Sequence, residues 1–291
     1  MIKASHPIER DYVEPLEDAH YELAPSNWTL IVSHLDGSGD LEGFFDSEND
    51  ALLAQQALEF LLGKEFENPF KLVQLKDKDW KESYKTHFKA WSRGIIHWVP
   101  EWERESYEVP CGHHALYVDP GMAFGTGNHE TTRLCLESMI DICERKQVKD
   151  CLDVGCGSGI LSLSASLLGI EKVRGIDSDP DAIKVATDNL NLNSVPVVAG
   201  FHIEALENLG VNEHFDLVVA NIQADVLMQN SESLIQLVRK DGFLVLSGIL
   251  TDEMDLVEDC FLNLLHRKQK LFETDKKILG EWSLMQLKLN T

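Results

Sequence analysis

The sequence contains no apolar run that approaches the roughly 18 residues a helix needs to cross a bilayer. Its first 18 residues are acidic and lack the hydrophobic segment of a secretory leader. The six cysteines are scattered without a CxxC pair, which favours reduced thiols over disulfides. These absences predict a cytoplasmic protein with no membrane partner.

Positive charge is also scarce, because 26 lysines and arginines face 49 aspartates and glutamates, for a formal net charge of −23. Such a surface repels phosphates, so we expect no direct binding to nucleic acid. The excess of acidic residues is large in the first 50 residues, which carry twelve acids against Lys3 and Arg10. A basic partner would be attracted to it, although a solvated face that serves solubility explains it equally well.

Length and composition predict two domains, since 291 residues with 44% hydrophobic content can bury a large core. Residues 1–26 are acidic and contain three prolines, which predicts an extended arm. We expect a small α+β domain over 27–75, a linker over 76–93 and a larger domain over 94–291.

The small domain is predicted from strand-like runs at 28–33, 41–45 and 70–75. Between the last two, Ser47 to Asp50 resembles a capping box that opens a helix with leucines at helical spacing.

Strands and helices alternate through the larger domain, which predicts an α/β fold with a mostly parallel sheet and helices on both faces. The expected strands are 94–100, 115–118, 151–154, 172–176, 197–201, 215–221 and 242–248. Helices are expected over 131–143 and from near Gly159, Pro180, Ala224 and Thr251, and segments 270–273 and 282–289 predict a closing antiparallel hairpin.

A glycine loop, Asp153-Val-Gly-Cys-Gly-Ser-Gly159, follows the strand at 151–154. Gly155, Gly157 and Gly159 allow a sharp turn and a close approach of ligand to backbone. The next strand ends at Asp177, 22 residues after Gly155, where an acid can accept hydrogen bonds from two ribose hydroxyls. Together they predict a site for an adenosine nucleoside or a dinucleotide.

The loop spacing is GxGxG instead of the GxGxxG typical of a pyrophosphate site, and Asp153 stands just before it. A carboxylate there would repel phosphate and favour the ammonium or sulfonium of S-adenosylmethionine, directly or through water. Backbone N–H groups would bind the methionine carboxylate. A nicotinamide oxidoreductase is therefore disfavoured.

A third motif ends the strand at 215–221 with Asn221, followed by Ile222. An Asn side-chain carbonyl and a neighbouring backbone carbonyl can accept hydrogen bonds from an amine and hold its lone pair in line with a methyl group. An Asn that merely ends a strand in a turn is the alternative for this motif taken alone.

Together these residues resemble the ribosomal protein L11 methyltransferase (PrmA) family of class I S-adenosylmethionine-dependent enzymes, from about Trp28 to the end of the chain. The resemblance rests on the runs 119–132, 153–161, 175–177, 219–222 and 246–250, with 74–80 similar to the interdomain segment.

The resemblance implies methylation of lysine or N-terminal amines of ribosomal protein L11, with Asn221 and Ile222 at the reacting centre. It implies cofactor binding by Thr132, Gly155, Asp177 and Asn221. It also places the loop of Phe124, Gly125, Thr126 and Gly127 against the cofactor. The family's N-terminal ferredoxin-like domain looks truncated here, because the acidic arm replaces its first strand and helix.

Other readings remain open at this point. A methyltransferase of another protein or of a small amine is the main rival, and a non-catalytic S-adenosylmethionine-binding module is a third possibility. We expect no metal site, because Cys111, His113 and His114 lack a second ligand pair at suitable spacing. His129 is expected to stabilise its loop by a hydrogen bond.

Overall fold

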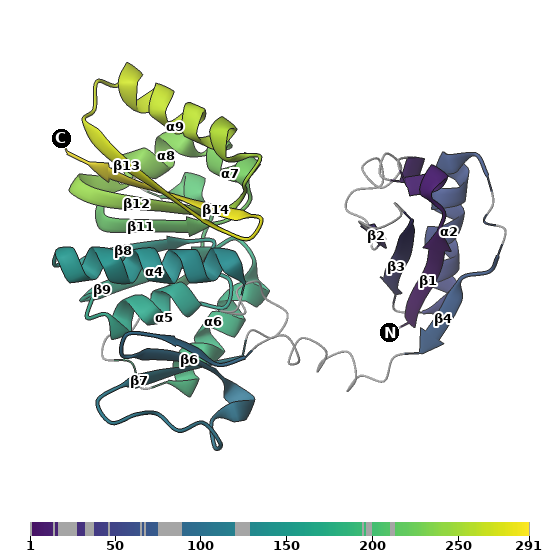
Figure 1. Cartoon of the computed structure of the whole chain (residues 1–291), viewed down its shortest axis with the longest axis horizontal. Coiled ribbons are helices and arrows are strands. Elements are labelled where there is room, and N and C mark those ends of the chain that lie inside the picture. The colour runs from purple at the N-terminus through teal and green to yellow at the C-terminus, as the bar shows by residue number, and fades with distance from the viewer. Residues whose placement is uncertain are drawn as a thin grey trace. The chain divides into compact units, whose positions relative to one another are not determined.

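The computed structural model describes residues 2–13, 15–16, 28–32, 38–45, 47–64, 66, 68–74, 89–119, 129–193, 195, 200–209 and 213–290. The chain divides into two compact units, Met1–Tyr84 and Lys85–Thr291, each with its own hydrophobic core (Figure 1). Within the described ranges, none of the helices is both long and apolar enough to span a membrane.

The N-terminal unit is a four-stranded antiparallel sheet packed against helix α2 (Glu48–Leu62). Its strands are β1 (Ile2–Ile8), β2 (Trp28–Val32), β3 (Gly39–Phe45) and β4 (Lys71–Gln74), in the order β2-β3-β1-β4. This is the strand order of a ferredoxin-like domain. Leu58 of α2 joins Trp28, Phe45 and Phe70 in a buried cluster, so the unit has a core of its own.

Strand β1 corrects the expectation of an arm over 1–26. It lies inside the sheet, pairing with β3 along its whole length and with β4 over its first half. Its alternate side chains are buried, but Ala4 is small and His6 is polar, so the alternation carries little hydrophobic signal. Pro7 lies beyond the stretch paired with β4, which limits the cost of its missing N–H. The first strand is therefore present, and residues 17–27 lie outside the described part.

The helix start predicted at Ser47 is confirmed, with Ser47 as the N-cap residue. The Asp50 N–H donates to the Ser47 hydroxyl at 3.2 Å, and α2 starts at the next residue, Glu48. The helix ends at Gly63, whose φ of 63° suits a glycine C-cap.

The C-terminal unit is built on a seven-stranded sheet in the order β10-β9-β8-β11-β12-β14-β13. The strands are β8 (Asp150–Val154), β9 (Lys172–Asp177), β10 (Gly200–Ile203), β11 (Phe215–Asn221), β12 (Val238–Leu250), β13 (Phe272–Leu279) and β14 (Trp282–Leu289). The first five in the spatial order are parallel, and β14 inserts antiparallel between β12 and β13. The predicted fold class, a class I methyltransferase sheet with a closing hairpin, is confirmed.

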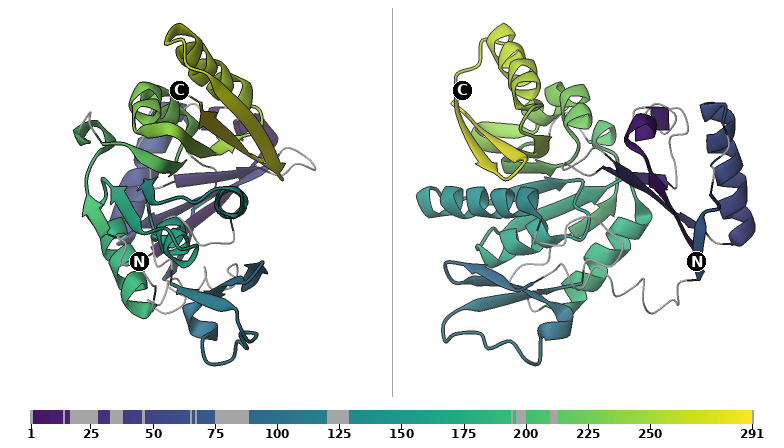
Figure 2. Two further views of the ribbon diagram at one scale, coloured as in Figure 1. Left: turned by 90° about the vertical axis from the view of Figure 1, so that its left-hand side faces the viewer. Right: turned by 45° about the vertical axis from the view of Figure 1, so that its right-hand side comes forward.

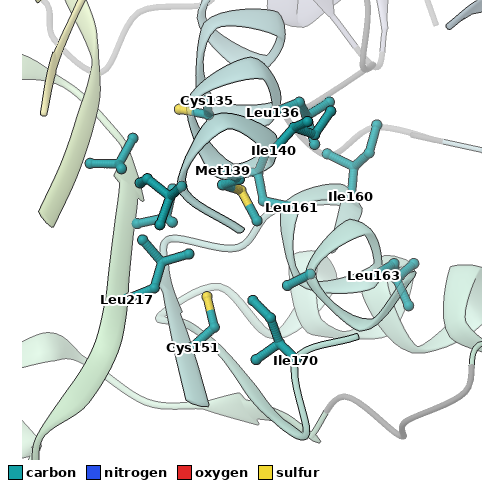
Figure 3. Close-up of a cluster of buried hydrophobic side chains, with 14 of the residues drawn as sticks. Cys135, Leu136, Met139, Ile140, Cys151, Ile160, Leu161, Leu163, Ile170 and Leu217 are labelled. Carbon is teal, nitrogen blue, oxygen red and sulfur yellow. The ribbon is translucent and has the colours of Figure 1, made fainter. Parts of the chain in front are cut away.

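Helices cover both faces of this sheet (Figure 2). One face carries α4 (Glu130–Arg145), α5 (Ile160–Leu167) and α6 (Pro180–Leu192), and the other carries α7 (Ala224–Gln229), α8 (Ser231–Gln236) and α9 (Met254–Arg267). Figure 3 shows the first core, where Cys135, Leu136, Met139 and Ile140 of α4 meet Ile160, Leu161 and Leu163 of α5 above Cys151 and Leu217 of the sheet. This dense packing fixes the strand ends that carry the predicted motifs.

A second, three-stranded sheet adjoins α5 and α6 and consists of β5 (Trp91–Arg93), β6 (Ile96–Pro100) and β7 (His114–Val118). Trp98 is fully buried and its indole N–H donates to the Ser164 hydroxyl at 2.8 Å. Because β5 belongs to this sheet, the linker predicted over 76–93 ends before Trp91, while residues 75–88 lie outside the described part.

Strand β10 includes the end of the run predicted at 197–201, whose first three residues, 197–199, fall outside the described residues. Strand β12 extends the run predicted at 242–248 in both directions.

Candidate active site

The glycine loop joins β8 to α5 at the carboxyl end of the parallel strands. Gly155, Gly157 and Gly159 have φ values of 67°, 51° and 78°, a region that side-chain-bearing residues rarely adopt. A Cβ on Gly155 would also lie 2.4 Å from Cγ2 of Ile222. The sequence therefore needs glycine here both for the turn and for a close neighbour.

Asp177 ends β9 beside this loop. Its Oδ2 accepts a hydrogen bond from the Gly157 N–H and its Oδ1 accepts one from the Asp179 N–H, both at 3.0 Å. The two backbone donors fix the carboxylate while each oxygen keeps a lone pair for a further donor. Helix α6 then begins at Pro180, capped by Asp179.

Asp153 has a different position from the one we expected. Its side chain is 1% exposed, and its Oδ2 accepts from both the N–H and the hydroxyl of Ser162, at 3.0 and 2.7 Å. Its Oδ1 is buried without a partner among the described residues. Burial raises the pKa of Asp153 to about 6, and the carboxylate does not line the cavity described below.

Asn221 ends β11 and is 7% exposed. Its Nδ2 donates to the Thr132 hydroxyl at 3.5 Å, whereas its Oδ1 is buried without a partner among the described residues. Thr132 is fully buried in the first turn of α4. The next residue, Ile222, lies between two glycines, because a Cβ on Gly248 would be 2.3 Å from the Ile222 carbonyl oxygen. A buried, unpaired acceptor therefore ends β11 at a point where the backbone is tightly held.

These strand ends surround a cavity of about 850 Å³. It is lined by Val154, Gly155, Gly157, Ile176, Asp177, Ser178, Asp179, Ala182, Glu204, Ala205, Leu206, Asn221, Ile222, Gln223, Val226, Asn230, Gly248 and Trp282. Of the predicted site residues, Gly155, Gly157, Asp177, Asn221 and Ile222 thus share one cavity. Thr132 does not line the cavity but contacts Asn221, which does. Gly159, at the end of the glycine loop, does not line the cavity either.

A profile of the ribosomal protein L11 methyltransferase (PrmA) family matches residues 15–289. The chain belongs to this family. The ribosomal protein L11 methyltransferase of Streptococcus equi subsp. zooepidemicus is 32% identical over 286 residues, which cover 96% of this chain and 85% of the relative. That of Caldicellulosiruptor saccharolyticus is 36% identical over 288 residues, with 96% and 86% covered. A crystal structure of the ribosomal protein L11 methylase of Lactobacillus delbrueckii subsp. bulgaricus matches with a TM-score of 0.60 and 28% identity, covering 70% of this chain and all of that one.

The cofactor of the ribosomal protein L11 methyltransferase family is S-adenosylmethionine, and the residues present fit it. The positive-φ glycines leave the backbone of the loop open to a ligand, and Asp177 stands at the distance along the chain expected of a ribose acid. The unpaired Oδ1 of Asn221 supplies an acceptor beside the cavity. The cofactor and the Asn221 hydrogen-bond acceptor can therefore share one site.

Several lining residues escaped the sequence analysis in spite of the family resemblance, among them Glu204 and Trp282. Glu204 lies just after β10 and Trp282 starts β14. Each lines the cavity because of the order of the strands in the sheet, which the sequence does not show locally. Gly248 lay inside a recognised motif, but its contact with Ile222 depends on strand pairing. The available signals for Glu204 and Trp282 were an acid just after one strand and an aromatic at the start of another.

The predicted cofactor loop of Phe124, Gly125, Thr126 and Gly127 lies outside the described residues. The nearby His129 was expected to stabilise this loop by a hydrogen bond, and the structure shows it bonded to Thr131 in the first turn of α4. The His129 Nδ1 caps α4, 2.9 Å from the Thr131 hydroxyl, and its ring meets Trp282 edge-on with centroids 4.9 Å apart.

Among the histidines considered as metal ligands, His113 is engaged elsewhere. Its Nδ1 lies 2.7 Å from Nε2 of the buried His97, whose Nδ1 lies 2.7 Å from the Tyr107 hydroxyl. Cys111 is exposed. Across the described residues, no group of three or more His, Cys, Asp or Glu side chains could hold a metal ion.

Proposed function

We propose that this protein transfers methyl groups from S-adenosylmethionine to amines of ribosomal protein L11, namely lysine side chains, the N-terminal α-amine or both. The observation that carries the proposal is the Asn221 carboxamide, which is buried at the cavity with its Oδ1 unpaired among the described residues. An unpaired buried acceptor costs stability, so its retention at a cavity points to a ligand donor. An amine N–H is a donor of the right kind.

Several residues are assigned to the cofactor. The backbone of the loop that contains Gly155, Gly157 and Gly159 is assigned to the methionine end of the cofactor, and Asp177 to the ribose hydroxyls. Thr132 acts through Asn221, whose amide it holds. Asp153 acts from behind the loop, because its Oδ2 is taken by Ser162 at the start of α5.

The reaction needs a neutral amine, since the attacking nitrogen must offer its lone pair. An α-amine has an ordinary pKa of about 7.7 to 8.0 and a lysine one of about 10.4, and desolvation lowers both. The sulfonium supplies an electrophilic methyl group. Asn221 Oδ1 and the Ile222 carbonyl would accept hydrogen bonds from the amine N–H groups. These bonds would align the nitrogen lone pair with the methyl group, which is catalysis by positioning.

The proposed substrate is a basic ribosomal protein. The methyltransferase would bind it in the cytoplasm without itself contacting nucleic acid or membrane. The strong negative charge of the chain supports attraction of such a partner. The alternative of a different methyl acceptor rested on a missing first strand and helix. Strand β1 supplies the strand and completes the four-stranded sheet, which weakens that reason.

The test is transfer of radiolabelled methyl from S-adenosylmethionine to ribosomal proteins from a strain deleted for this gene, resolved by size. One labelled band at the size of ribosomal protein L11 is the expected result, and mass spectrometry of that band identifies the amine. Label in another protein or in the small-molecule fraction would reassign the substrate. Cofactor binding without any label would favour the non-catalytic module.

A further inference from the structure

Helix α6 carries a buried polar side chain that joins two distant backbone segments. Asn189 is 1% exposed. Its Nδ2 donates to the Ser158 carbonyl in the glycine loop, and its Oδ1 accepts from the Asp119 N–H just after β7, both at 2.9 Å. Because one backbone partner is a donor and the other an acceptor, only one orientation of the carboxamide satisfies both.

A matched residue lies one helical turn later. Asn193 also bridges backbone groups, but both of its β7 contacts go to Tyr117, whose N–H it accepts at 2.8 Å and to whose carbonyl it donates at 2.6 Å. Asn193 therefore ties α6 to β7 alone. Only Asn189 of the two reaches the glycine loop.

The same helix packs closely on this loop. A Cβ on Gly159 would lie 2.9 Å from the Cβ of Ala186, so little space separates α6 from the loop backbone. The Gly159 N–H donates to the Cys156 carbonyl at 2.8 Å. The Ser158–Gly159 peptide is thus held by the loop itself on its N–H side and by Asn189 on its carbonyl side.

We propose that Asn189 is a positioning residue of the cofactor site. Its carboxamide fixes the Ser158–Gly159 peptide and thereby the backbone of the glycine loop, against which the amino-acid end of S-adenosylmethionine binds in the proposed function. It has no direct bond to the ribose acid, because Asp177 is held by Gly157 and Asp179. The inference rests on the cofactor part of the proposed function and is independent of the methylated substrate.

The test compares two ligands in the full-length protein by titration calorimetry. S-adenosylhomocysteine carries the amino-acid end, and 5′-methylthioadenosine lacks it. Asn189→Asp keeps an oxygen for the Asp119 N–H but sets the other against the Ser158 carbonyl. Losing one such hydrogen bond should raise the dissociation constant of S-adenosylhomocysteine about tenfold, and that of 5′-methylthioadenosine less than about threefold.

Asn193→Asp is the control, because it makes the same chemical change on the same helix. Both of its dissociation constants should stay within about twofold of the wild type. Equal weakening of both ligands by Asn189→Asp would assign Asn189 a merely structural role. An unchanged constant for S-adenosylhomocysteine would also overturn the proposal.

Amide hydrogen exchange of the wild type, followed by NMR, serves if the variant does not fold. Coupling between the loop and Asn189 is reciprocal, so S-adenosylhomocysteine should slow exchange of the Asp119 amide more than that of Tyr117. Equal effects on the two amides would overturn the proposal. Failure of the protein to methylate ribosomal protein L11 would leave both measurements valid.

Discussion

Asn221 and Thr132 make a side-chain contact of 3.5 Å, although 89 positions separate them in the chain. The contact joins the end of β11 to the first turn of α4, with Nδ2 of Asn221 as the donor and the Thr132 hydroxyl as the acceptor. The other end of the carboxamide, Oδ1, has no partner among the described residues and is the atom that we propose accepts from the substrate amine.

Replacement of Asn221 should therefore affect turnover far more than cofactor binding. Asn221→Ala removes the acceptor that aligns the amine, and misplacement of a reacting group costs about a hundredfold in rate. We expect kcat for methyl transfer to fall by at least about that factor, with the cofactor dissociation constant within about threefold of the wild type. Initial rates and calorimetry measure the two quantities. Asn263→Ala, at an exposed position of α9, is the control, and equal turnover in Asn221→Ala and wild type would refute the role.

Removal of the Asp177 carboxylate should weaken binding of the cofactor. Asp177→Ala deletes a charged acceptor and frees the Gly157 N–H, and hydrogen bonds to charged groups predict a dissociation constant raised about ten- to a hundredfold. Calorimetric titration with S-adenosylhomocysteine checks it. Asp188→Ala removes an equal charge from an exposed site on α6 and should leave affinity unchanged. A similar loss in both variants would mean that general electrostatics is responsible.

Two glycines with similar backbone angles should respond very differently to alanine. Gly169 has a φ of 85° and nothing within 4 Å of an added Cβ, so Gly169→Ala should cost only about 1 to 2 kcal/mol for the backbone conformation. Gly248 has a φ of 81°, and an added Cβ would meet the Ile222 carbonyl oxygen at 2.3 Å. Gly248→Ala should destabilise the protein considerably more and abolish methyl transfer. Thermal unfolding and activity measure both, and equal costs would contradict the close approach.

The buried carboxylate of Asp153 should leave a mark on the pH dependence of stability. Its folded pKa, about 6, lies above its ordinary value of 3.8 because burial disfavours the charged form. Between these values the unfolded chain loses the proton while the folded chain keeps it, so this group makes the free energy of unfolding fall as pH rises. Converted at about 1.4 kcal/mol per pH unit, the loss is about 3 kcal/mol.

Asp153→Asn cannot ionise and should lack this component. The difference in unfolding free energy between wild type and variant, from urea titrations, should change across pH 4 to 6 and become flat above about pH 7. Asp188→Asn at an exposed position provides the reference. A difference that does not vary with pH would show that Asp153 stays charged at little cost.

The sequence was sufficient for those features that local chemistry encodes. Positive φ angles could be predicted at Gly155, Gly157 and Gly159, and a helix start at Ser47. These residue types satisfy local backbone requirements. The alternation of strands and helices was equally readable, since each element must bury one face. The joining of Asn221 with Gly155 at one cavity then followed from the rule that parallel sheets bind ligands at their carboxyl ends.

What escaped prediction depends on contacts between distant segments. Strand β1 was missed because His6 is buried by its environment, with its Nε2 3.1 Å from the Asn68 carbonyl and its ring beside Phe66 and Phe70. A polar residue satisfied by a partner 62 positions away has no local signal. The hydrogen bonds that Asp153 accepts from Ser162 were missed for a related reason, since Ser162 lies one helix turn beyond the loop.

The position of β14 has a consequence for how the protein matures during its synthesis. β13 leaves the ribosome before β14, yet it pairs only with β14, which occupies the place next to β12. Trp282, at the start of that final strand, lines the cavity and contacts His129. A nascent chain from which β14 has not yet emerged therefore lacks both an anchored sheet edge and one wall of its cavity.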